Sequence, residues 1–79
     1  MPRYYFDVRD ADGFHPDEVG VELADIKEAR EQCQGLLPDI AREELPDGEL
    51  HTIVCDVRDE AGRVVYRGQI TYEGTVNPI

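Results

Sequence analysis

The longest regular pattern of apolar and polar positions runs from Asp25 to Leu45 and has the period of an α-helix. Its apolar stripe consists of Ile26, Ala29, Cys33, Leu36, Leu37 and Ile40. Asp25 and Glu28 have the spacing of a capping box at the start of the helix. Pro38 removes one backbone hydrogen bond, but the stripe keeps its phase across it. The pattern therefore predicts one kinked helix, which is ended by Pro46, Asp47 and Gly48.

Four shorter stretches alternate between apolar and polar residues, as strands do. They cover residues 4–9, 19–23, 52–58 and 64–72. The first and the third run into similar turns, Asp10–Gly13 and Asp59–Gly62. Residues 14–18 are expected to be irregular because Pro16 cannot donate to a strand ladder.

These elements predict an α+β fold in the order β-β-α-β-β. One four-stranded, mainly antiparallel sheet carries the kinked helix on one face, and the order of the two hairpins within the sheet is left open. The stripe and the strand parity predict that Leu36, Leu37 and Ile40 are buried against Phe6, Ile53 and Ile70. Cys33 and Cys55 share these apolar faces, and we expect both to be buried, reduced thiols.

The chain of 79 residues is expected to form a single domain over residues 1–79, with residues 74–79 as a loose tail. No secretory signal is recognisable at the start, and no apolar run approaches the roughly 20 residues of a membrane span. A cytoplasmic protein without membrane contact is the resulting expectation.

The net charge of −10 is unevenly distributed along the chain. Residues 10–49 contain thirteen acids and three bases, whereas the remainder contains five of each. The whole excess of negative charge therefore belongs to the first connection, the second strand and the helix. The other strands carry most of the arginines.

Strand parity separates these charges in space. If Tyr4, Phe6 and Val8 face the helix, their neighbours face the other way. The predicted open sheet face carries Tyr5, Asp7, Arg9, Val54, Asp56, Arg58, Val65 and Arg67. Two interpretations remain open for this face. It is either a ladder of cross-strand Asp–Arg pairs or a surface that binds an acidic partner or an anion.

Sequence signatures of catalysis and metal binding are missing. The chain has no serine, no glycine-rich phosphate loop and no dinucleotide fingerprint. The Asp10–Gly13 turn suggests a calcium loop, but Val8 and Val19 occupy its key ligand positions. His15 and His51 lack metal-site spacing and are expected to be exposed. We therefore expect no enzyme and no catalytic, cofactor-binding or metal-binding residues.

A short pattern occurs twice in the chain. Asp7-Val8-Arg9-Asp10 is followed by Gly13, and Asp56-Val57-Arg58-Asp59 is followed by Gly62. The repetition fits either a duplicated hairpin or two turns with the same chemical requirements. We favour the second interpretation because nothing else aligns between the two halves.

The chain resembles a family of short bacterial proteins known only as a domain of unknown function. The resemblance rests on the Pro-Arg-Tyr-Tyr-Phe opening at 2–6, the Asp-x-Asp-Gly turn at 10–13, the segment Asp-Glu-x-Gly-Val-Glu-Leu at 17–23, and residues 57–65. It implies a small cytoplasmic protein and brings no catalytic residues. The chain is also loosely similar to small antitoxins that have paired tyrosines, an Asp-Gly turn and a Pro-Asp pair before a helix.

The expected function is a non-enzymatic protein-interaction or accessory module, acting with a protein partner or as a homodimer. The first alternative is nucleic-acid or anion binding through the arginine-bearing face, which the net charge of −10 opposes. A further alternative is an antitoxin-like partner protein.

Overall fold

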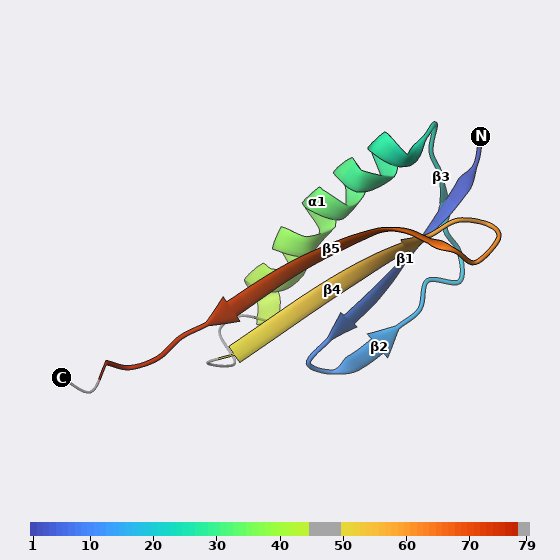
Figure 1. The fold of residues 1–79 in the computed structure, drawn as a ribbon. Coiled ribbons are helices and arrows are strands. Elements are labelled where there is room, and N and C mark those ends of the chain that lie inside the picture. The colour runs from blue at the N-terminus through green and yellow to red at the C-terminus, as the bar shows by residue number, and fades with distance from the viewer. Residues whose placement is uncertain (45–49, 78–79) are drawn as a thin grey trace.

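The computed structural model describes residues 1–44 and 50–77 (Figure 1). Its elements are β1 (Arg3–Asp10), β2 (Gly13–His15), β3 (Val21–Glu22), α1 (Ile26–Glu44), β4 (Leu50–Arg58) and β5 (Val64–Glu73). One helix beside an antiparallel sheet confirms the predicted α+β fold. The sheet has five strands rather than four: β3 is a short part of the predicted strand 19–23, and β2 was not expected. The prediction that residues 14–18 are irregular was wrong at Phe14 and His15, which pair with β1 before Pro16.

The strand order in the sheet is β2-β1-β4-β5, and β3 also pairs with β1. Every pairing is antiparallel. The two long hairpin strands β1 and β4 lie side by side in the middle, with Phe6 opposite Val57 and Val8 opposite Cys55. This pairing settles the hairpin order, which the sequence left open.

The interruption between β2 and β3 has a local cause. β2 pairs with residues 8–10 of β1, and β3 pairs with residues 3–4. Between them, the Asp17 carboxylate accepts the backbone N–H of Phe6 at 3.0 Å. A side chain therefore replaces the ladder bond that a continuous strand would supply, next to Pro16, which has no N–H of its own.

Helix α1 is continuous through Pro38, as the uninterrupted stripe predicted. The Asp25 carboxylate accepts the backbone N–H of Glu28 at 3.0 Å, and Glu28 accepts that of Ala24 at 2.8 Å. The expected capping box is therefore present, with the Glu28 contact shifted by one residue. The predicted helix end at Leu45 and the stop at Pro46–Gly48 lie outside the described residues.

The hydrophobic core lies between α1 and the sheet. Its buried members are Tyr4, Leu23, Ala29, Cys33, Leu37, Ala41, Ile53, Cys55 and Val57. Both cysteines are buried and free, as predicted. Leu37 is buried, whereas Leu36 and Ile40 are half-buried and pack against the core. The stripe was wrong at Ile26, which is 48% exposed in the first turn of the helix.

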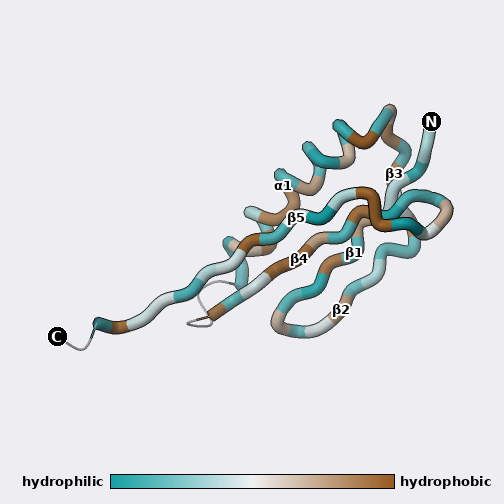
Figure 2. The backbone as a smooth tube through the Cα atoms, in the orientation of Figure 1, coloured by the Kyte–Doolittle hydropathy of each residue, from teal (hydrophilic) through white to brown (hydrophobic). Residues whose placement is uncertain are grey.

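The helix is not centred on the sheet. It packs over β4 and β5, and β1 and β2 extend beyond it on the other side (Figure 1). Phe6 and Val8, on the helix side of β1, are consequently only half-buried. Hydrophilic positions predominate along α1, whereas hydrophobic positions recur along β4 (Figure 2). This offset leaves space between the helix and β1.

Residues 74–77 form neither helix nor strand. Among the described residues, no helix combines the length and the apolar character needed to cross a membrane.

Candidate functional site

The predicted open sheet face is dominated by two pairs of opposite charges. Asp7 and Asp56 lie directly opposite each other on β1 and β4. Arg58 donates two side-chain N–H groups to Asp7, and Arg67 donates two to Asp56. Each aspartate is therefore neutralised by a fork-shaped guanidinium contact, which offsets the repulsion between the two carboxylates.

Asp7 is the better protected of the two aspartates. It is 6% exposed, because the segment between β2 and β3 folds against it and the backbone N–H of Asp17 donates to it at 2.8 Å. Arg58 also donates to the carbonyl of Asp17 at 3.0 Å and lies 4.8 Å from the centre of the Tyr5 ring. The hydrogen bond from Arg58 holds the pKa of Asp7 below its usual value.

The other arginines on this side of the molecule are also engaged. Arg9 lies 5.0 Å from the centre of the Phe14 ring. Arg3 approaches Glu22 at 3.6 Å, and Arg63 approaches Asp59 at 3.6 Å. Both aspartates of this face are thus paired with arginines across strands, as in the first of the two interpretations, whereas Arg9 stacks on Phe14.

The apolar members of the predicted face are less exposed than expected. Tyr5 is half-buried beneath Arg58, and Val54 is half-buried opposite Arg9. Val65 packs against the core next to an irregularity in the β4–β5 register between Val57 and Arg58. The exposed apolar surface near this face belongs instead to Phe14, which is stacked by Arg9, and to Val64, which lies opposite Arg58.

Hydrogen bonds to the Asp17 carboxylate hold the segment 17–20 against the edge of β1. Besides Phe6, Asp17 accepts the backbone N–H groups of Val19 and Gly20, each at 3.0 Å. Gly20 has φ of 74°, and a Cβ there would come within 2.8 Å of the Tyr5 ring. Burial raises the pKa of Asp17, but the three backbone N–H bonds outweigh it and the net pKa is lowered. The Asp-Glu-x-Gly motif therefore has a structural role, because Asp17 and Gly20 fix the conformation of this segment.

The repeated Asp-Val-Arg-Asp pattern also has a structural explanation. Asp10 accepts the backbone N–H of Asp12, and Asp59 accepts that of Ala61, each at 2.9 Å. The glycine closing each turn has a positive φ, 122° at Gly13 and 86° at Gly62. Both turns therefore use the same local chemistry.

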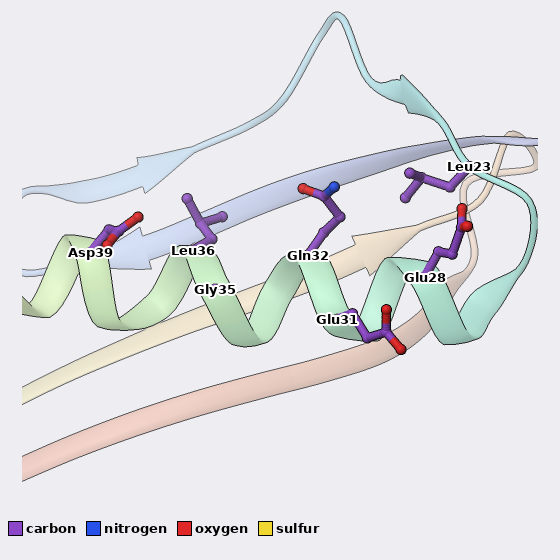
Figure 3. Close-up of a pocket in the computed structure, with 7 residues that line it drawn as sticks. All are labelled: Leu23, Glu28, Glu31, Gln32, Gly35, Leu36 and Asp39. Atoms are coloured by element: carbon purple, nitrogen blue, oxygen red, sulfur yellow. The ribbon is translucent and has the colours of Figure 1, made fainter.

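A concave surface lies on the opposite side of the sheet, along the flank of α1 that faces β1. One hollow, with a volume of ≈ 600 Å³, is open to solvent (Figure 3). Its lining residues are Leu23, Glu28, Glu31, Gln32, Gly35, Leu36 and Asp39. Figure 3 shows Gln32 and Leu36 rising from the helix on the side towards Leu23, which belongs to the incoming loop.

A second hollow of ≈ 570 Å³ continues along the same flank of the helix. Its lining residues are Val8, Asp10, Asp12, His15, Ile40, Glu43 and Glu44. We call the two hollows together the acidic groove. Its helical wall consists of two rows with a spacing of four residues, one from Glu28 to Glu44 and one from Glu31 to Glu43. No lysine or arginine lines it among the described residues.

Three carboxylates converge at one end of the acidic groove. Oxygen atoms of Asp10, Asp12 and Glu44 lie within 4.8 Å of one another. His15 Nε2 lies 3.1 Å from Asp10 Oδ1. Burial and the neighbouring Asp10 raise the pKa of Glu44. Burial also raises the pKa of Asp10, but hydrogen bonds from the Asp12 N–H and from His15 outweigh it, so the net pKa is lowered.

His51 belongs to the same end of the molecule. Its Nε2 lies 3.8 Å from Glu44 Oε2, and within the described residues neither atom has a hydrogen-bond partner. The expectation that His51 is exposed was wrong, since it is only 7% exposed. Its parity with Ile53, Cys55 and Val57 on β4 would have indicated burial. His15 is exposed, as expected.

The sequence located the acids on the helix side but did not reveal the groove. The groove could be predicted only by knowing that α1 is displaced towards β5, and that displacement depends on how the helix packs on the sheet. The convergence of Asp10 and Asp12 with Glu44 has no signal in the sequence, because more than thirty residues separate the hairpin turn from the helix end.

The comparisons with known proteins assign a family and no activity. A family model described as Domain of unknown function (DUF6894) matches residues 3–71, and the chain belongs to that family. No curated protein and no solved structure matched the chain. The family supplies no catalytic, ligand-binding or partner residues that could be placed on this structure.

Proposed function

We propose that this member of a family of unknown function is a protein-interaction module, and that its acidic groove binds a basic, partly apolar segment of a partner protein. The observation that carries the proposal is the displacement of α1 from β1. It leaves a long concavity with apolar side chains at its base and carboxylates along its walls.

Charge complementarity supports a basic occupant. Glu31, Glu43 and Asp12 are exposed and have no ion-pair or side-chain hydrogen-bond partner within the described residues. Acids that already serve the fold, such as Glu28 in the helix cap, add to the same potential. Lysine or arginine side chains arriving from a partner would find unpaired carboxylates, which favours both encounter and orientation.

The dimensions favour a short segment rather than a large surface. The wall from Glu28 to Glu44 rises by about 24 Å at 1.5 Å per residue. An extended peptide of about seven residues covers that length. Leu23, Leu36 and Ile40, which line the groove, offer contacts to apolar side chains between the basic ones.

The open sheet face supports an interaction less well. Arg58 and Arg67 are already held by Asp7 and Asp56, so an acidic partner or a nucleic-acid phosphate would have to displace those carboxylates. A face-to-face dimer that exchanges Asp7 and Asp56 between copies would break the same contacts. For these reasons we propose the groove in place of that face.

A random heptapeptide display library selected against the folded protein tests the proposal. We expect selected peptides to combine lysine or arginine with apolar residues. Removing two free carboxylates by Glu31→Gln with Glu43→Gln should weaken the best synthetic peptide about fivefold, because exposed ion pairs contribute up to about 1 kcal/mol each.

The matched control is Glu18→Gln with Glu73→Gln, which removes the same charge from exposed positions outside the groove. Equal weakening by both double variants would mean that only net charge matters and would refute a groove site. Selected peptides without basic residues would refute it as well.

Gly35 allows a steric test. It lines the groove, and a Cβ at this position would meet no atom within 4 Å. Gly35→Arg should abolish peptide binding by adding bulk and positive charge, whereas Gly35→Ala should bind normally. Light scattering on the same variants identifies a second copy as the occupant if wild type forms a dimer that only Gly35→Arg disrupts.

A further inference from the structure

We propose that the carboxylates of Asp10, Asp12 and Glu44 bind one divalent transition-metal ion at the β1–β2 end of the acidic groove, and that the exposed His15 ring turns away from Asp10 to become a nitrogen ligand. The ion would occupy one end of the groove proposed above and share Asp12 with it, but ion binding does not require peptide binding. It joins the first hairpin to the end of α1, which otherwise packs over β4 and β5.

The geometry is close to that of a coordination shell. The three carboxylate oxygens lie within 4.8 Å of one another, and ligands bound at about 2.0–2.2 Å lie at most about 4.4 Å apart. The carboxylate oxygens need to move by less than about 1 Å to reach the separation of bound ligands. His15 lines the same hollow, and its Nε2 lies 3.1 Å from Asp10 Oδ1. Its ring nitrogens are not within 4.8 Å of all three carboxylates, so the exposed ring must turn to reach the ion.

An independent observation comes from a different element. His51, on β4, is more than nine-tenths buried, and its Nε2 points at Glu44 Oε2 across 3.8 Å. Both atoms are buried without a hydrogen-bond partner among the described residues. Carboxylates that bind a metal are themselves held by hydrogen bonds from behind, and His51 is placed to supply that bond after a small shift of Glu44. The unsatisfied pair therefore points to a ligand on the exposed side of Glu44.

The donor set selects the class of ion. Three carboxylates with one imidazole suit Zn²⁺ or Mn²⁺, whereas Ca²⁺ and Mg²⁺ prefer oxygen ligands alone. Thiolate coordination is disfavoured, because Cys33 and Cys55 are buried in the core and burial raises the pKa of both thiols. Three clustered acids also gain most from a cation, which relieves their mutual repulsion.

Zn²⁺ titration of chelator-treated protein, followed by calorimetry and by the thermal midpoint, tests the site. We expect one ion per chain and a rise in the midpoint. Asp12→Asn and Glu44→Gln should each weaken binding at least about tenfold. Asp12 is exposed in a hairpin turn that asparagine also tolerates, so its variant separates lost binding from lost folding.

Glu43→Gln is the matched control, since Glu43 neighbours Glu44 but lies outside the cluster. It should leave Zn²⁺ affinity unchanged, although with Glu31→Gln it should weaken peptide binding, so failures of the two proposals are distinguishable. Absence of Zn²⁺ binding, equal loss in Glu43→Gln, or full binding in Glu44→Gln would overturn the site. A thiolate charge-transfer band with Co²⁺ would do so as well.

Discussion

Replacing Asp7 by asparagine removes the negative charge that holds Arg58 while keeping the size of the side chain. The two pairs on the open sheet face share the same fork-shaped contact but differ in exposure. The side chains of Arg58 and Asp7 are 30% and 6% exposed, whereas those of Arg67 and Asp56 are 59% and 16% exposed. Burial should therefore decide how much each pair contributes to stability.

The expected magnitudes follow from that difference. Breaking a fully buried pair costs about 3–5 kcal/mol, and an exposed pair contributes about 0–1 kcal/mol. Asp7 is buried but Arg58 is partly solvated, so Asp7→Asn should cost about 2–3 kcal/mol. Asp56→Asn should cost at most about 1 kcal/mol. In a domain of this size the first change lowers the melting midpoint by about 10–20 °C.

Urea unfolding of both variants at neutral pH measures the difference. Equal costs for Asp7→Asn and Asp56→Asn would refute the reasoning, because the fork-shaped contact is shared while the Asp7 pair is more buried and is also bonded to residue 17. A double-mutant cycle with Arg58→Gln isolates the pair energy from the hydrogen bond that Asp17 donates to Asp7.

The same variant predicts a pH dependence. The pKa of Asp7 is lowered in the folded protein, so its contribution is complete above the unfolded pKa of about 4 and is lost as the pH falls through the folded value. The stability gap between wild type and Asp7→Asn should therefore narrow in acid. A gap that is constant from pH 7 to about pH 3 would contradict a charge-based contribution.

Three further predictions concern the core and the helix. Gly68→Ala should cost about 1–3 kcal/mol, because a Cβ there would come within 2.8 Å of Cys33 Sγ, while Gly35→Ala on the open helix surface should stabilise by about 0.5–1 kcal/mol. Leu37→Ala should cost about 2–5 kcal/mol in thermal unfolding, and an unchanged midpoint would exclude Leu37 from the core. Cys33 and Cys55 should react with a thiol reagent only after unfolding, and rapid stoichiometric labelling of the folded protein would contradict their burial.

The sequence alone determined the local structure of this protein. Apolar periodicity located the start of α1 to within one residue, and the Asp25–Glu28 spacing correctly indicated its cap. Alternation identified the long strands β1, β4 and β5, and the two Asp-x-x-Gly turns follow β1 and β4 as expected. These features depend on neighbours within four residues or on the two-residue period of a strand, so they are readable without knowledge of the fold.

Only the tertiary structure decided which charges meet and where the surface is hollow. Parity placed Asp7, Asp56, Arg58 and Arg67 on one face, but their pairing required β1 and β4 to be adjacent. The burial of Asp7 required the segment around Asp17 to fold back. The acidic groove exists because α1 packs over β4 and β5, and its end cluster joins residues distant in the chain. Such contacts depend on the three-dimensional positions of whole elements, which no local pattern specifies.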